Sequence, residues 1–135
     1  AVLRVKLNYL QEWNESRRRH ARVYCDQLRD CPLILPVEAE HAESVYHLFV
    51  VRTEKRDALN EFLNERGVTA GIHYPIPVHL QPSYKDLGYM KGDFPISEQY
   101  ADEILSLPMY PELNSGQIDY VCQTIRDFFN DSRLK

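Results

Sequence analysis

The chain has 135 residues, of which 44% are apolar and 27% charged, and its formal net charge is −4. This length suits one domain with a hydrophobic core, and the acidic balance argues against nucleic acid as a partner, because nucleic-acid binding needs basic patches. No apolar run reaches the about eighteen residues of a membrane span, and no secretory leader is recognisable, so we expect neither membrane insertion nor export. The three cysteines match no zinc or redox spacing. They indicate reduced, mostly buried thiols in a cytoplasmic protein.

The first thirty residues show the periodicity of one long helix. Its apolar positions form two neighbouring stripes, represented by Leu3, Leu7, Leu10, Val5 and Trp13. A helix that is apolar around so much of its circumference needs more than one surface to cover it. A dimer, a broad core and a missing upstream domain are the alternatives.

Two apolar segments follow, and both resemble strands. Residues 33–37 form the first, and "SVYHLFVVR", residues 44–52, the second. Both faces of the second are apolar, so we expect it to be covered on both sides. His47 alternates there with Val45 and Phe49, which favours a buried core histidine over a functional one.

The middle of the chain predicts a helix, a strand and a short helix. In this part of the chain Thr53 is expected to cap the longer helix and Gly67 to end it. Residues 68–72 read as a short strand that leads into a proline-rich loop. Pro82 suits the first position of a short helix, "PSYKDL", and Gly88 its end.

A helix over residues 96–105 and an extended stretch, "SLPMYP", precede the last helix. Asn114 and Gln117 form a capping-box-like pair that opens this last helix. The buried stripe of the helix is expected to comprise Ile118, Val121, Cys122, Ile125 and Phe129. The order of elements predicts an α+β fold, with a small sheet, helices packed against it and a long helix at the start.

The loop "GIHYPIPVHLQPSY", residues 71–84, concentrates histidine, tyrosine and proline. In a polyproline conformation His73 and His79 would lie about 19 Å apart, which is too far for one metal ion. Ser83 lacks the setting of a nucleophile, and the chain contains no phosphate or dinucleotide fingerprint. We therefore assign no metal ligand and no catalytic residue.

Two interpretations of this loop remain. Prolines fix a loop in advance and so reduce the entropy cost of binding. His79 and Gln81 lie just ahead of the helix expected at Pro82, where the N–H groups of Ser83 and Tyr84 would favour phosphate or sugar hydroxyls. The other interpretation is a rigid surface loop whose rings only pack.

Several motifs in this chain occur together in one known family. They are "VYHLFVVR", "RDALNEFLNERGV", "GIHYPIPVHLQPSYKDLGY" and "GDFPISEQYADEILSLPMYPEL", followed by the closing helix with Gln117 and Ile118. In this order they closely resemble the C-terminal small domain of the DegT/DnrJ/StrS family, over about residues 4–129. These proteins are pyridoxal-phosphate-dependent sugar aminotransferases of the aspartate-aminotransferase fold, which is fold type I.

The resemblance implies an activity that needs more than this chain. Such enzymes move an amino group from glutamate to a nucleotide-linked keto-sugar, as homodimers with active sites at the subunit interface. Their large N-terminal domain holds pyridoxal phosphate and supplies the lysine of the Schiff base. The lysines of this chain lie outside that motif, namely Lys6, Lys55, Lys85, Lys91 and Lys135. Residues 1–135 are thus expected to be a single small domain, inactive and without a cofactor of its own.

The resemblance also identifies candidate substrate-binding residues. In relatives the segment that matches residues 73–81 approaches the active site, and His79 matches the histidine that reaches the sugar nucleotide. His73, Tyr74 and Gln81 are further candidates on the same loop, whereas Tyr110 is expected to pack. The alternative to this function is an independent α+β interaction module that binds an anionic ligand or a partner protein.

Overall fold

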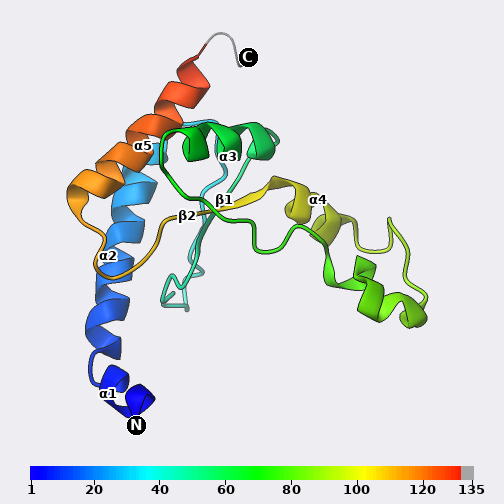
Figure 1. Ribbon diagram of the computed structural model, residues 1–135, viewed down its shortest axis with the longest axis horizontal. Helices are drawn as coiled ribbons and strands as arrows, with labels where there is room; N and C mark the ends of the chain where they lie inside the picture. Colours follow the sequence, from blue (N-terminus) through cyan, green and yellow to red (C-terminus); the bar gives the residue numbers. More distant parts are fainter. Residues whose placement is uncertain (132–135) are drawn as a thin grey trace.

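Helices pack against one short sheet in the computed structural model, which describes residues 1–131 (Figure 1). The α+β fold predicted from the sequence is confirmed. The elements are α1 (Val2–Leu7), α2 (Leu10–Leu28), β1 (Phe49–Arg52), α3 (Arg56–Glu65), the 3-10 helices η1 (Val78–Leu80) and η2 (Pro82–Leu87), α4 (Pro95–Glu103), β2 (Ile104–Leu107) and α5 (Ser115–Asn130). No helix within residues 1–131 combines the length and apolarity needed to cross a membrane.

The sheet consists of β1 and β2, which pair antiparallel. Phe49 lies opposite Leu107 and Val51 opposite Leu105, and all four side chains are buried in the core. This alternation is what a strand with one buried face requires. Single bridges flank the pair, from Ile34 to Arg52 on one side and from Gly71 to Ser106 on the other.

The expected strands are therefore shorter than their sequences suggested. Residues 33–37 and 68–72 contribute only the bridges at Ile34 and Gly71. Residues 44–48 lie outside the sheet because Tyr46 has a positive φ of 45°, which turns the chain. The prediction of a core histidine was wrong, since His47 is exposed on this turn, as are Val45 and Leu48.

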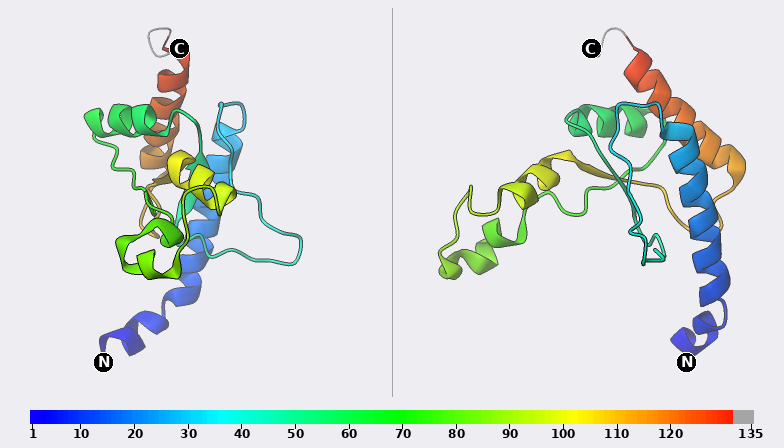
Figure 2. Two further views of the ribbon diagram at one scale, coloured as in Figure 1. Left: turned by 90° about the vertical axis from the view of Figure 1, so that its right-hand side faces the viewer. Right: turned by 180° about the vertical axis from the view of Figure 1, so that it is seen from behind.

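Three helices bury one face of the sheet. α2 and α5 lie side by side, and α3 packs against α5 (Figures 1 and 2). The ring of Tyr24 stacks on Phe49 with 5.0 Å between centroids, and its hydroxyl donates to the Pro108 carbonyl at 3.0 Å. The Gln27 amide donates to Asp119 and so links the two long helices. These contacts place the core between the sheet and its helices.

The first helix is interrupted, contrary to the sequence prediction. The N–H groups of Asn8 and Tyr9 donate to carbonyls three residues back, those of Val5 and Lys6. This tight turn separates α1 from α2, and asparagine favours such turns because its side chain competes for backbone hydrogen bonds. α1 projects beyond the core with its apolar side chains exposed (Figure 1).

The predicted helix ends were confirmed where a local sequence signal is strong. Asn114 and Gln117 form the predicted capping box, and Gly67 and Gly88 adopt the expected positive φ. Thr53 is not the N-cap of α3, which is Lys55, although Thr53 Oγ1 accepts a hydrogen bond from the Lys55 N–H at 3.3 Å.

The predicted helix over residues 96–105 and the predicted stripe of α5 need two corrections. α4 ends at Glu103, because Ile104 and Leu105 pair with β1 in the sheet. In α5 it is Phe128, at 1% exposure, that is buried, whereas Phe129 is half-buried.

Candidate functional site

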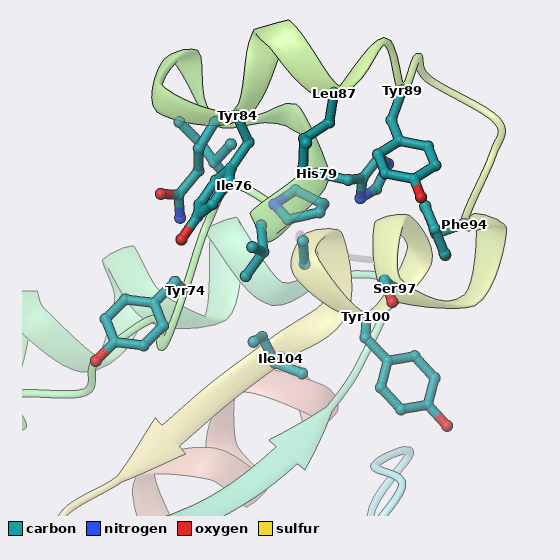
Figure 3. A pocket seen from close by; sticks show the side chains of 14 residues that line it. Tyr74, Ile76, His79, Tyr84, Leu87, Tyr89, Phe94, Ser97, Tyr100 and Ile104 are labelled. Atoms are coloured by element: carbon teal, nitrogen blue, oxygen red, sulfur yellow. The ribbon is translucent and has the colours of Figure 1, made fainter.

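The proline-rich loop, η1, η2 and α4 form an arm that extends away from α2 and α5 (Figures 1 and 2). A pocket of about 590 Å³ opens along this arm, which is a volume suited to a small-molecule ligand. Side chains from all four segments line it (Figure 3). The arm thus provides a cavity at the residues singled out in the sequence.

Three of the four predicted site residues line this pocket, namely Tyr74, His79 and Gln81. His73 does not. Its Nδ1 lies 2.9 Å from the Ser106 hydroxyl on β2, and its ring lies over Gly71. A Cβ on Gly71 would come within 2.7 Å of that ring, so a side chain there would require the imidazole of His73 to shift. His73 therefore anchors the loop to the sheet.

His79 is held within the pocket wall. Its Nε2 lies 3.0 Å from Glu98 Oε1, and the two side chains are 8% and 12% exposed. Its ring packs against Phe94 with 4.8 Å between centroids, and Phe94 in turn contacts Tyr89 at 5.1 Å (Figure 3). The histidine thus has a fixed orientation before any ligand arrives.

Glu98 is a site residue that the sequence did not reveal. It follows His79 by nineteen positions and lies on a different element, α4. The Gly92 N–H donates to its Oε1 at 2.7 Å. This backbone donor, with a smaller contribution from His79, lowers the pKa of the Glu98 carboxyl, while burial opposes the shift. Glu98 is therefore a carboxylate at neutral pH.

The pocket, called the aromatic pocket below, is mostly apolar with several aromatic rings, and its described lining carries no Lys, Arg, Asp or Glu. Tyr84, Tyr89, Phe94 and Tyr100 contribute rings. Aromatic walls of this kind suit planar rings and the apolar faces of sugars. Polar recognition would rest on a few groups, chiefly His79, Gln81 and the tyrosine hydroxyls.

The anion site expected at the start of the short helix is not supported. That segment is the six-residue 3-10 helix η2, and the Tyr84 N–H already donates to the Gln81 carbonyl at 2.9 Å. Because no cationic side chain lines the described pocket either, its geometry favours hydroxyl and ring recognition over phosphate binding.

The described residues do not by themselves fit a metal ion or pyridoxal phosphate. Within residues 1–131 no three His, Cys, Asp or Glu side chains are grouped to hold a metal. A pyridoxal phosphate site needs a lysine against the cofactor. No lysine of the described part lines the aromatic pocket, and Lys91 borders only a smaller neighbouring cavity of about 200 Å³.

Comparisons with known proteins identify the family. Residues 1–126 match the DegT/DnrJ/EryC1/StrS aminotransferase family. The chain is 47% identical over 127 residues to the erythromycin biosynthesis sensory transduction protein EryC1 of Saccharopolyspora erythraea, covering 93% of the chain and 35% of EryC1. It is 42% identical to the dTDP-3-amino-3,4,6-trideoxy-α-D-glucose transaminase of Streptomyces venezuelae, covering 95% of the chain and 34% of that enzyme.

The fold comparison agrees with the sequence comparison. The crystal structure of S. venezuelae DesV in complex with a ketimine intermediate superposes with a TM-score of 0.92 at 40% identity, covering 96% of this chain and 35% of DesV. The chain therefore spans about a third of the length of the relatives it matches. By sequence and by fold, the chain belongs to the DegT/DnrJ/EryC1/StrS aminotransferase family.

Proposed function

We propose that residues 1–135 are the C-terminal small domain of a cytoplasmic, homodimeric aminotransferase that moves an amino group from glutamate to a nucleotide-linked keto-sugar. The family depends on pyridoxal phosphate. Relatives act, by their names, on dTDP- and UDP-linked amino sugars. The cofactor and its reactive lysine would belong to a larger domain, since the chain matches only about a third of each relative.

The aromatic pocket on the arm carries this proposal. It brings together Tyr74, His79 and Gln81. These residues belong to the segment that the family resemblance leads us to expect at the active site. We infer that this pocket forms the part of the substrate site that the small domain contributes. The competing function is an independent interaction module that binds an anionic ligand or a partner protein. The match of residues 1–126 to an aminotransferase family favours the aminotransferase domain over such a module.

The residues of this chain would bind and orient the substrate. The rings of Tyr84, Tyr89 and Tyr100 would pack against its apolar faces and exclude water. His79 and Gln81 would hydrogen-bond its hydroxyl or carbonyl groups. Pyridoxal phosphate, when bound by the intact enzyme, supplies the chemistry that carries the amino group. None of the described residues is given a proton-transfer role.

The test uses the full-length protein that contains this chain, assayed with dTDP- and UDP-linked 3-keto-sugars and glutamate. Replacing His79 with alanine should raise the KM for the sugar nucleotide about three- to tenfold, which corresponds to one lost hydrogen bond. His47→Ala is the matched control, since His47 is exposed and lies outside the pocket. An unchanged KM in the His79, Tyr74 and Gln81 variants alike would overturn the assignment of this pocket to substrate.

A further inference from the structure

One oxygen of Glu98 joins three segments of the arm. Its Oε1 accepts the Gly92 N–H at 2.7 Å and lies 3.0 Å from His79 Nε2. The three residues belong to α4, to the turn before it and to η1. Because the backbone N–H of Gly92 can only donate a hydrogen bond, Glu98 Oε1 must be the acceptor in this contact.

The same geometry determines which nitrogen of His79 carries the proton. An ionised carboxylate has no hydrogen to give, so the contact at Nε2 requires an Nε2–H group. In a neutral imidazole the other nitrogen, Nδ1, is then an acceptor. Phe94 packs against the ring, and Tyr89 packs against Phe94. These contacts restrain rotation of the ring that would exchange the two nitrogens.

Nδ1 of His79 remains available to a ligand. Within residues 1–131 it makes no hydrogen bond, yet no buried side-chain nitrogen or oxygen of that part of the chain lacks a partner. Nδ1 is therefore reached by solvent rather than sealed in the wall. Since His79 lines the aromatic pocket, a bound molecule can approach it there.

We propose that Glu98 is a positioning residue that fixes His79 with Nε2–H bonded to the carboxylate and Nδ1 open as an acceptor. The group recognised by Nδ1 would be a hydrogen-bond donor of the ligand, such as a sugar hydroxyl. This inference rests on the proposed substrate site. It adds Glu98 to the site, specifies the Nε2–H tautomer of His79, and predicts that the ligand presents a hydrogen-bond donor to Nδ1.

A purely structural role for Glu98 would make different predictions. If Glu98 only linked Gly92 to His79, it would stabilise the arm regardless of which imidazole nitrogen faced the ligand. Glu98→Gln is the conservative variant that should keep the orientation of His79, because the Gly92 N–H orients the amide oxygen to the place of Oε1, where it can still accept from Nε2–H. Glu98→Leu removes the acceptor, and Asp102→Ala is the control, since Asp102 is an exposed acid on the same helix.

The tautomer is measured by ¹⁵N side-chain NMR of the 135-residue chain at pH 8. We expect the Nε2–H form of His79 in the wild type, in Glu98→Gln and in Asp102→Ala, and a mixture of both forms in Glu98→Leu. An Nδ1–H form in the wild type overturns the inference, as does an unchanged tautomer in Glu98→Leu. The wild-type and Glu98→Gln spectra decide the question even if the leucine variant does not fold.

Kinetics of the full-length protein separate this inference from the proposed function. Glu98→Leu should raise the KM for the sugar nucleotide about as much as His79→Ala, the double variant should add little, and Glu98→Gln should remain close to wild type. If His79→Ala raises the KM and Glu98→Leu does not, the positioning role is wrong and the substrate site stands. If neither variant raises it, the positioning role of Glu98 and the substrate contact of His79 both fail, and the assignment of the pocket then depends on the Tyr74 and Gln81 variants.

Discussion

Arg52 on β1 donates two hydrogen bonds to one oxygen of Glu103 at the end of α4, at 3.1 Å from Nε and 2.8 Å from Nη2. The other carboxylate oxygen accepts from the Gln99 amide at 2.7 Å. The Arg52 guanidinium also lies over the ring of Tyr100, 3.7 Å from its centroid. Because Tyr100 lines the aromatic pocket, this cluster connects the sheet of the core to the candidate site.

Glu103 should make the stability of the chain depend on pH. Hydrogen bonds from Arg52, and then from Gln99, hold the pKa of its carboxyl below the ordinary value. A depressed pKa in the folded state contributes stability above the unfolded pKa of about 4.3, and that contribution is lost as the pH falls through the folded value. Glu103→Gln should therefore lower the unfolding free energy at pH 7 and reduce its loss on acidification.

Urea unfolding at pH 7 and at several values below pH 5 measures this effect. Glu61→Gln, at an exposed position of α3, is the control and should keep the wild-type dependence on pH. A Glu103→Gln variant whose stability falls with acid as steeply as the wild type would contradict the prediction.

The capping box of α5 offers a local test of stability. The Asn114 side chain accepts the Gln117 N–H at 2.9 Å, and the Gln117 side chain accepts the Asn114 N–H at 3.0 Å. Asn114→Ala should lower the unfolding free energy by about 1 kcal/mol, and Asn114→Ser should restore most of it, because serine also caps well. Thermal and urea unfolding measure both. Equal stability of the two variants would show that the cap contributes little.

The capping box could be predicted because its signal lies within four adjacent residues. The same holds for Gly88, which ends η2 with a φ of 77°. Pairing between strands that are far apart in the sequence could not be predicted from such local signals. The sequence around Leu105 favours a helix, but Leu105 pairs with Val51 of β1 and therefore lies in the sheet. Tyr46 lies in a run of residues that favour strands, yet its turn keeps residues 44–48 out of the sheet.

The candidate site, too, was predictable only where its residues lie close together in the sequence. Tyr74, His79 and Gln81 are close in sequence and share one loop, so their common pocket followed from the loop. The separation of His73 from them depends on Ser106, which is thirty-three residues away. Glu98 could not be identified because its contact with His79 exists only after α4 folds back on the loop. Contacts between elements, rather than residue types, account for what was missed.

The three thiols should differ in reactivity. Burial raises the pKa of Cys122 to about 12, with Arg126 opposing the shift, and burial also raises the pKa values of the half-buried Cys25 and Cys31. Since the thiolate is the nucleophile, iodoacetamide at pH 8 should alkylate Cys25 and Cys31 well before Cys122. Peptide mass spectrometry measures the rates, and in denaturant all three should react alike. Native alkylation of Cys122 as fast as Cys31 would contradict its burial.

The apolar face of α1 should affect the behaviour of the 135-residue chain in solution. Leu3 is 82% exposed and Leu7 65%, with Val2 and Val5 beside them. A contiguous apolar surface of this kind favours association or binding of hydrophobic dyes. The chain should therefore self-associate in sedimentation experiments or enhance the fluorescence of such a dye.

Replacing both Leu3 and Leu7 with lysine should reduce association and dye binding, because charge makes burial of this face unfavourable. Val37→Lys is the matched control: Val37 is 94% exposed but belongs to the segment between α2 and β1 rather than to α1, so its replacement should change neither property. A monomeric wild type that binds no dye would show that the exposed face of α1 has no such consequence. Equal effects of the control and the double variant would instead indicate a general effect of added charge rather than a property of α1.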